Sequence, residues 1–309
     1  MIKFDKIKLV TNISDIEIID SNKFHSTVKN NIVVSAKMYQ EVPYLLIIKF
    51  DYEAQEVIIE FTGKILGAEY KKLISADTIA QCFTNINNLG FCRINIEGII
   101  THAEVVKCDV TLDAQDINIT ELTQYIRSNL KSYRKYQCSL LANKNLIIDK
   151  NVTTKKFKKR MTIYDKGKEM RRSSNIRFAH ACGLQDTFDG ICRFELNLNS
   201  KEQIRNALNI ESTSLESLLA SRANPILDFM KEIVSPPEHL FIKDKQTYTA
   251  MLVLKDNDYD LAKVEALMRG FHKRGTNINK IMEQYRSILS KIQEQNSSCQ
   301  YQCILDKLS

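Results

Sequence analysis

Apolar and polar residues alternate along three segments of the chain, at residues 105–113, 157–166 and 190–198. Successive strand residues point to opposite sides of a sheet, so each segment predicts a strand with one apolar and one polar face. Such strands are typical of an antiparallel sheet that helices cover on one side only. The predicted polar faces carry Lys107, Asp109, Thr111 and Asp113, then Lys158, Arg160, Thr162, Tyr164 and Lys166, then Arg193, Glu195 and Asn197.

The rest of the chain divides into a part rich in strands and a part rich in helices. β-rich runs predict further strands at 44–50, 56–63 and 137–149, and helical spacing predicts helices at 75–90 and 118–131. After Ser200 we expect helices at 201–209, 213–222, 224–234, 258–270 and 277–294, with a Pro-Pro turn and a strand within 235–254. The pattern therefore predicts an α+β fold, with a central antiparallel sheet, helices on one face and a helix-rich C-terminal region.

The composition predicts the cellular compartment of the protein and the sign of the charge on its partner. The eight cysteines include no Cys-x-x-Cys pair, which favours reduced structural thiols over disulfides or zinc. There is no run of about 18 apolar residues and no signal peptide at the start, so we expect a cytoplasmic protein that does not bind membranes. The net charge of +7 fits an anionic partner, and basic residues gather between Lys150 and Arg177.

Acids, cations and a tyrosine would meet on the polar face of the predicted sheet. Asp109, Asp113 and Glu195 offer the oxygen ligands that a hard divalent cation prefers. Tyr164 supplies a nucleophile, with Lys166 beside it on the same predicted strand face. These are the components of phosphoryl-transfer chemistry, which depends on positioning and charge stabilisation. The alternative is that each strand presents ordinary solvated residues with cross-strand charge pairing.

Three stretches follow one another in a recognisable order: Lys107-Cys108-Asp109, Tyr164-Asp165-Lys166-Gly167-Lys168-Glu169-Met170 and Arg193-Phe194-Glu195. This order of motifs resembles that of the rolling-circle replication initiators of filamentous phages and related plasmids, distant members of the HUH endonuclease superfamily. The resemblance covers roughly residues 44–210. An earlier stretch, EVIIEFTGKIL, is similar to a further strand of that family and adds Glu60 to the acidic candidates. The five histidines include no His-x-His pair, the superfamily's usual metal motif, which leaves the choice of metal ligands open.

The resemblance implies an HUH- or RRM-like nicking domain over residues 1–205, with N-terminal strands in 1–100 and catalytic strands in 101–205. Residues 206–309 would form a helical domain for DNA recognition or oligomerisation. The implied reaction is metal-dependent nicking and rejoining of one DNA strand through a 5′-phosphotyrosyl intermediate. Its implied partners are single-stranded or hairpin origin DNA, a host helicase and polymerase, and a second copy of the chain in a homodimer.

The residue roles implied by the resemblance fall into three groups. Tyr164 would be the nucleophile, assisted by Lys166. Asp109, Glu195, Asp113 and Glu60 would hold Mg²⁺ or Mn²⁺. The DNA backbone would be held by Lys155, Lys156, Lys158, Lys159, Arg160, Lys168 and Arg193.

The sequence leaves several alternatives open. Tyr133 and Tyr136 are spaced like the paired tyrosines of some nickases, and His102 lies near enough in sequence to join the metal site. The basic segment 269–280 is a candidate for origin recognition. The same sequence features also fit a DNA-binding initiator or repressor without catalysis, a mobilisation relaxase, or an RNA-binding structural protein.

Overall fold

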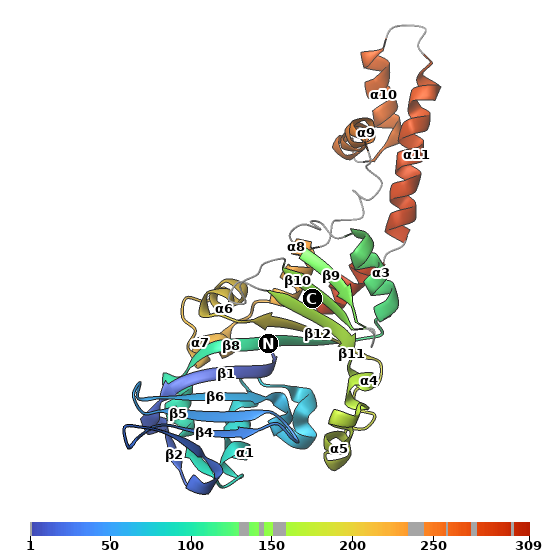
Figure 1. Cartoon of the computed structure of the whole chain (residues 1–309). Coiled ribbons are helices and arrows are strands. Elements are labelled where there is room, and N and C mark those ends of the chain that lie inside the picture. The colour runs from blue at the N-terminus through green and yellow to red at the C-terminus, as the bar shows by residue number, and fades with distance from the viewer. Residues whose placement is uncertain are drawn as a thin grey trace.

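In the part of the chain that the structure describes, a ten-stranded antiparallel sheet forms the centre of the protein (Figure 1). The computed structural model describes residues 2–129, 136–141, 145–150, 159–233, 244–257, 259–272, 277–297 and 300–309. Across the sheet the strands are β3 (His25–Lys29), β4 (Ile32–Gln40), β5 (Leu46–Asp51), β6 (Glu56–Thr62), β1 (Phe4–Asn12), β8 (Glu104–Gln115), β12 (Ile191–Leu198), β11 (Arg160–Asp165), β10 (Leu146–Lys150) and β9 (Tyr136–Leu140). β2 (Ile16–Ile18) and β7 (Cys92–Ile94) form a separate pair.

The two halves of the sheet have the same strand order. β1 and β8 are antiparallel neighbours at the centre. After each of them the chain crosses to the outer edge of its half and returns through four antiparallel strands, β3 to β6 or β9 to β12. The last strand of each set pairs with the central strand that began it. The fold therefore repeats one topology twice, although the sequence shows no repeat.

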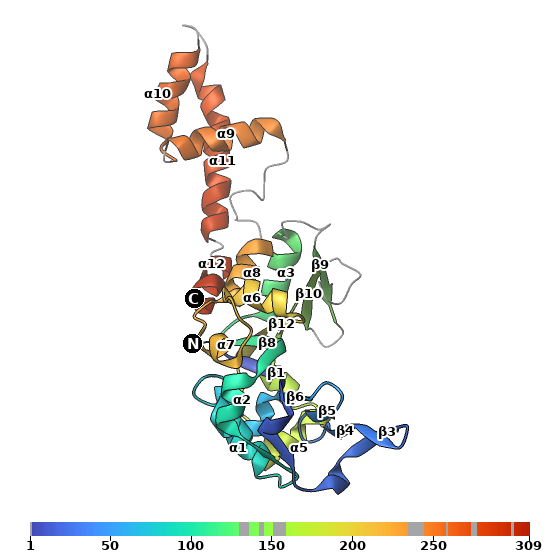
Figure 2. The same cartoon turned by 90° about the vertical axis from the view of Figure 1, so that its left-hand side faces the viewer.

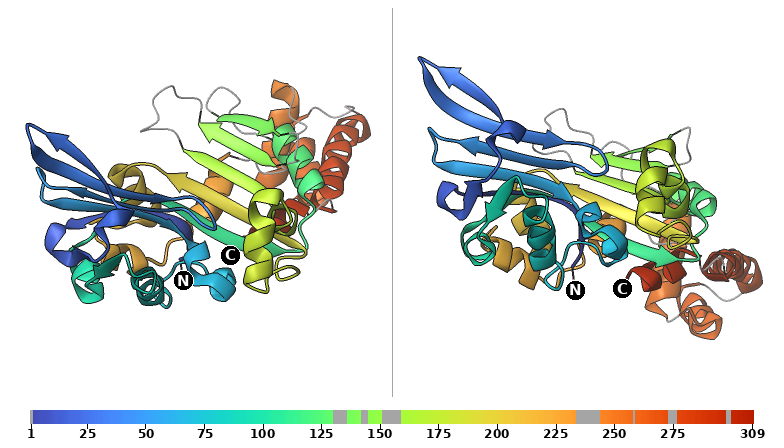
Figure 3. Two further views of the ribbon diagram at one scale, coloured as in Figure 1. Left: turned by 60° about the horizontal axis from the view of Figure 1, so that its bottom comes forward. Right: turned by 90° about the horizontal axis from the view of Figure 1, so that it is seen from below.

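Helices cover one face of this sheet (Figure 3). The main hydrophobic core lies between these helices and the sheet. The inward residues of β11 and β12, such as Ile163 and Phe194, have no exposed surface. Each such side chain contributes roughly 1.5–3 kcal/mol through burial. The covering helices are α1 (Ile79–Asn87), α2 (Ile96–His102), α3 (Ile119–Asn129), α6 (Lys201–Leu208), α7 (Leu215–Ala220), α8 (Pro225–Ile233) and α12 (Gln300–Leu308).

The other face of the sheet is polar, and three short helical segments pack at one end of it. They are η3 (Gly63–Lys72), α4 (Lys166–Met170) and α5 (Ser173–Ala181). Tyr70, Phe178 and Phe188 form the centre of a small separate core between them. The predicted fold class is confirmed. Over their described residues, the predicted strands at 105–113, 157–166 and 190–198 share one antiparallel sheet, because β12 lies between β8 and β11.

The C-terminal helices belong to two different bodies. α9 (Lys245–Asp256), α10 (Leu261–Phe271) and α11 (Ile278–Ser297) share their own apolar cluster and project from the sheet (Figures 1 and 2). α6, α7, α8 and α12 instead contribute to the core under the sheet. The predicted division into residues 1–205 and 206–309 therefore does not coincide with the buried clusters, since it cuts through α6, where Ile204 and Leu208 both face the main core.

Three predicted strands differ from the observed elements. The segment 137–149 is a hairpin of β9 and β10, closed where the Leu141 N–H donates to the Asn145 carbonyl at 2.9 Å. The second strand ends at Asp165 and not at Lys166, because α4 begins there. The apolar end of 235–254 is the helix α9, whose first turn is capped by Asp244 through a 2.7 Å bond from the Thr247 N–H. Within the described residues, no helix combines the length and apolar character that crossing a membrane requires.

Candidate active site on the polar face of the sheet

The register of the strands gathers most of the predicted site residues on the polar face. Directly paired residues of antiparallel strands lie on the same side of the sheet. Tyr164 therefore shares this face with the acids of β8 and β12, as the sequence predicts. Three consecutive rows across β8, β12 and β11 are Asp113, Arg193 and Tyr164, then Thr111, Glu195 and Thr162, then Asp109, Asn197 and Arg160.

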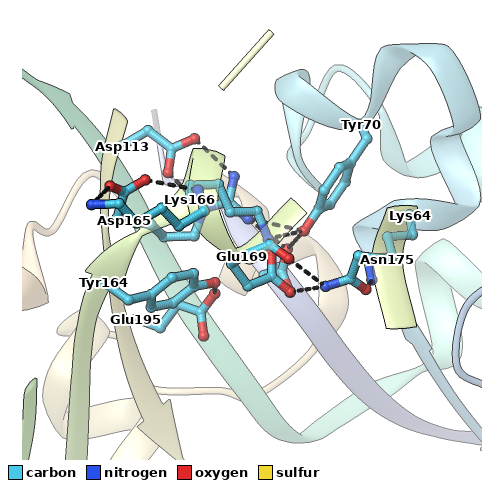
Figure 4. A network of polar contacts seen from close by, with 12 residues as sticks. Lys64, Tyr70, Asp113, Tyr164, Asp165, Lys166, Glu169, Asn175 and Glu195 are labelled. Carbon is cyan, nitrogen blue, oxygen red and sulfur yellow. Dashed lines mark hydrogen bonds and ion pairs between the residues drawn. The ribbon is translucent and has the colours of Figure 1, made fainter. Parts of the chain in front are cut away.

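Tyr164 and Glu195 form the centre of this site. The Tyr164 hydroxyl donates a short hydrogen bond to Oε1 of Glu195 (Figure 4). Tyr164 is only 6 % exposed, and burial, followed by the nearby charge of Glu195, raises its pKa well above the usual value. Burial, followed by the charge of Asp5, raises the pKa of Glu195 to about 7. At neutral pH the phenol therefore keeps its proton, while Glu195 is near the middle of its titration and is placed to accept it.

Lys166 lies close to Tyr164, but it reaches the site in a way that the sequence did not predict. Asp165 ends β11 and caps α4, accepting a 2.9 Å bond from the Lys168 N–H, so Lys166 is the first residue of a helix. Its ammonium is buried, 2.8 Å from the Tyr70 hydroxyl and 2.7 Å from Oε2 of Glu169. It lies 5.6 Å from the centre of the Tyr164 ring. The ammonium thus places positive charge beside the ring of Tyr164.

Arg193 is a buried cation that contacts acids on two strands, Asp113 on β8 and Asp5 on β1. Its side chain is fully buried and donates two bonds to Asp113, at 2.6 and 2.8 Å. Nη1 donates to Asp5 at 2.9 Å and to Tyr70 at 3.0 Å, and Tyr70 in turn donates to Asp5 at 2.7 Å. Burial alone would raise the pKa of Asp5, but Lys166 and Arg193 lower it below the usual value. The predicted contact of Arg193 with DNA does not fit this position, because its guanidinium is sealed from the surface.

A second chain of polar contacts fixes η3 and α5 against α4. Lys64 donates to Oδ1 of Asn175 at 2.5 Å, and Asn175 donates to Glu169, the partner of Lys166. Burial lowers the pKa of Lys64, although Glu169 opposes this effect. The sequence did not point to Asp5, Lys64, Tyr70 or Asn175, since they come from three separate segments, β1, η3 and α5, and none belongs to a recognisable motif. Only the fold brings them together, as Figure 4 shows for Lys64, Tyr70 and Asn175.

Two of the four predicted metal ligands are already paired with cations. Oε1 of Glu60 lies 2.5 Å from the Lys6 ammonium and Oε2 lies 3.3 Å from that of Lys8. Both carboxylate oxygens of Asp113 accept from Arg193. A divalent cation at either position would compete with a lysine or arginine in a partly buried place, so these two residues do not fit that role.

Asp109 and Glu195 fit a metal ion better, since they have uncharged hydrogen-bond partners. Asp109 accepts a 2.7 Å bond from Asn197, and burial raises its pKa. Glu195 accepts from Tyr164 one row away on the same face. In the described ranges, no group of three or more histidines, cysteines or acids is arranged to hold a metal ion. The predicted set of four carboxylates is therefore reduced to this pair.

The predicted DNA-binding residues are spread over both sides of the sheet. Lys155, Lys156 and Lys158 lie outside the described residues. The Lys159 ammonium lies 5.9 Å from the Phe229 ring of α8, which places it on the helix-covered side. On the polar face Arg160 makes two bonds to Asp149, at 2.7 and 3.2 Å. The exposed Lys168 pairs with Asp165 at 2.9 Å.

Two of the alternative candidates, Tyr136 and His102, lie away from Tyr164 and Glu195. Tyr136 is 3 % exposed on the helix-covered side, where its hydroxyl donates to Glu232 at 2.6 Å and its ring packs on Phe229. Tyr133 lies outside the described residues. His102 ends α2 and its Nδ1 lies 3.1 Å from Asp15, so it is held away from Asp109 by a different acid. Tyr164 therefore lies beside an acid on the polar face of the sheet, whereas Tyr136 and its acid Glu232 are on the helix-covered side.

No protein-family model, no curated protein and no solved structure matches this chain. The geometry of the site and the order of its motifs are what support a function.

Proposed function

We propose that this protein nicks and rejoins single strands of DNA and initiates rolling-circle replication of a phage or plasmid in the cytoplasm. The observation that carries the proposal is the contact between the Tyr164 hydroxyl and Glu195, whose pKa of about 7 suits a proton acceptor at neutral pH. The order of the motifs around Asp109, Tyr164 and Glu195, which resembles that of phage-like initiators, supports the same function.

In the proposed reaction, the Tyr164 oxygen attacks a phosphorus atom of the DNA backbone while Glu195 accepts the phenolic proton. The bond from phosphorus to the 3′ oxygen breaks, and that oxygen leaves with the bonding electrons and takes a proton from water. The products are a 5′-phosphotyrosyl enzyme and a free 3′-OH, which a polymerase can extend. Rejoining is the reverse reaction, with Glu195 returning the proton to the phenol.

The buried cations give the site its electrostatic character. Lys166 and Arg193 lie near Tyr164 and Glu195 but are paired with Glu169, Asp113 and Asp5. Their role is to hold Tyr164 and Glu195 in place and to limit how far burial raises the pKa of Glu195. Where Mg²⁺ or Mn²⁺ binds, it would stabilise charge on the phosphate. Of the two carboxylates that fit the ion, Asp109 would hold it, because a carboxylate that coordinates a metal ion cannot also accept the phenolic proton as Glu195 does.

One observation favours a second candidate function. Tyr164 is 6 % exposed and its hydroxyl is satisfied, as expected for a tyrosine that only stabilises the sheet of a non-catalytic DNA-binding initiator or repressor. A mobilisation relaxase would use the same chemistry as the nicking enzyme. Host helicase and polymerase partners and a homodimer belong to the replication proposal and follow from the resemblance alone.

The deciding experiment is a search for a covalent adduct. The protein is incubated with a pool of single-stranded oligonucleotides of random sequence and Mn²⁺, then denatured in SDS and separated by electrophoresis. The proposal expects a labelled band that resists SDS and disappears in EDTA and in Tyr164→Phe. A protein that binds the pool but forms no adduct would instead be the non-catalytic alternative.

A further inference from the structure

The polar face of the first half of the sheet carries two pairs of lysines that lie directly opposite each other. Lys37 of β4 pairs with Lys49 of β5, and Lys8 of β1 pairs with Lys107 of β8. Like charges at directly opposed positions destabilise a sheet. Two such pairs on one face are therefore a cost to folding that a bound anion would relieve.

The surrounding acids only partly neutralise these lysines. Asp51 lies 3.5 Å from Lys49, and Glu60 lies between Lys6 and Lys8. Among the described residues, Lys37 and Lys107 have no acid within ion-pair distance. Each lysine pair thus contains one lysine that can engage a partner outside the chain.

The same face offers an exposed aromatic ring and aliphatic side chains between the lysines. Tyr39 is 52 % exposed, and the Lys37 ammonium lies 5.5 Å from its ring centre. Ile47 and Ile58 are half-buried neighbours on β5 and β6. One row across the strands β4, β5, β6, β1 and β8 is Tyr39, Ile47, Glu60, Lys8 and Lys107.

This surface is continuous with the candidate active site. Lys6 pairs with Asp109, which pairs with Asn197 of β12, and Tyr164 lies on the next strand of the same face. From β4 to β11 there are six steps between neighbouring strands, roughly 29 Å at about 4.8 Å each. Helices α1 and α2 lie on the opposite side of these strands (Figure 3).

We propose that the polar face of β4, β5, β6, β1 and β8 binds the backbone of single-stranded DNA and leads it to Tyr164. Lysines that track phosphates, interrupted by an aromatic ring on which a base stacks, are the features that bind single strands without sequence preference. The inference rests on the proposed function, because it takes the strand at Tyr164 to be DNA. It assigns to the first half of the fold a binding role that complements the chemistry of the second half.

The test measures binding of fluorescent oligo(dT) by anisotropy in EDTA, as a function of salt. The double variant Lys37→Ala/Lys107→Ala should lower the salt slope by about 1.4, since each lost contact with a single strand contributes about 0.7. With this slope change, the loss of affinity relative to the native protein should be roughly 25-fold greater at 0.1 M than at 1 M salt. The melting temperature should stay the same or rise, because a repulsion is removed from each pair.

The matched control is Arg205→Ala/Lys231→Ala, which removes the same charge from exposed positions on α6 and α8 of the covered side. Its salt slope should equal that of the native protein. Tyr39→Ala should weaken binding at least about fivefold, whereas Tyr39→Phe, which keeps the ring, should not.

Three outcomes would overturn the proposal. The first is an unchanged salt slope in the double variant, and the second is an equal loss of salt slope in the control variant. The third is clearly tighter binding of oligo(U) than of oligo(dT), which would make RNA the ligand. The nicking reaction is judged separately by the adduct assay. Binding that depends on Lys37 and Lys107 without any adduct would support this surface and contradict the nicking proposal.

Discussion

Replacing Glu195 with glutamine tests the proposed proton transfer directly. Glutamine has nearly the same size and can still accept a hydrogen bond from Tyr164, but it is not a base at neutral pH. The pKa of Tyr164 is above its usual value, so at pH 7.5 less than roughly 0.3 % of the phenol would ionise unaided. A positioned general base contributes roughly 10²- to 10⁴-fold. We therefore expect Glu195→Gln to form the adduct at least about 100-fold more slowly at pH 7.5.

The pKa of Glu195 also predicts how the rate of adduct formation changes with pH. Below a pH of about 7 Glu195 is protonated in the folded protein and cannot accept the proton, so the native rate should rise with pH and level off above about 7. Glu195→Gln should lack that plateau, and its rate should keep rising up to about tenfold per pH unit as the phenol itself ionises. The measurement is the initial rate of adduct formation between pH 5.5 and 9, with one oligonucleotide selected from the adduct-forming pool.

Two results would refute the reasoning. If Glu195→Gln and the native protein have parallel pH profiles, Glu195 is not the proton acceptor. If higher Mn²⁺ restores the full rate of Glu195→Gln, the carboxylate acts as a metal ligand and not as a base. A melting curve of the variant shows whether the fold is intact and makes either result interpretable.

The same structure leads to four further predictions. Tyr164→Phe should abolish adduct formation while Tyr136→Phe retains it and loses only about 1 kcal/mol of stability with its bond to Glu232, as measured by urea unfolding. Asp113→Ala should cost about 3 kcal/mol or more in urea unfolding because it leaves Arg193 buried without its main partner, whereas Glu265→Ala, at an exposed pair, should cost less than about 1 kcal/mol. Adduct formation should require Mg²⁺ or Mn²⁺, and Asp109→Asn should raise the concentration needed; undiminished activity of the native protein in EDTA would exclude a metal role. The raised pKa of Glu195 should make the native protein up to roughly 3 kcal/mol less stable at pH 8 than at pH 4.5, after the same pH difference for Glu195→Gln is subtracted. The reason is that a carboxyl whose pKa is raised by folding loses its stabilising effect as the pH rises through about 7.

The amino-acid sequence by itself determined the faces of the three central strands. Alternation over 105–113, 157–166 and 190–198 is enough to place Asp109, Tyr164 and Glu195 on one side, because side chains along a strand alternate regardless of what the strand pairs with. The amphipathic helices after Ser200 were predictable for the same reason, since helical spacing records which side is buried. Local patterns of this kind are set by the period of the backbone.

The sequence could not determine which helices belong to which core. α8 and α12 lie on either side of the projecting helices α9 to α11 in sequence, yet both pack under the sheet. Each of these helices has an apolar face, and an apolar face does not specify its partner. The boundary predicted at 205/206 followed a change in local pattern, whereas the observed cores follow tertiary packing.

Only the tertiary structure decided the chemistry of Tyr164. The hydrogen bond from Tyr164 to Glu195 joins residues that are 31 positions apart in sequence, and Arg193 is fixed by Asp5, 188 residues away. Burial then changes what these groups can do, raising the pKa of Glu195 to about 7 and turning Arg193 from a candidate DNA contact into a structural cation. Residue types and strand faces can be read from the sequence, but burial and the identity of a charge's partner depend on segments that meet only when the chain folds.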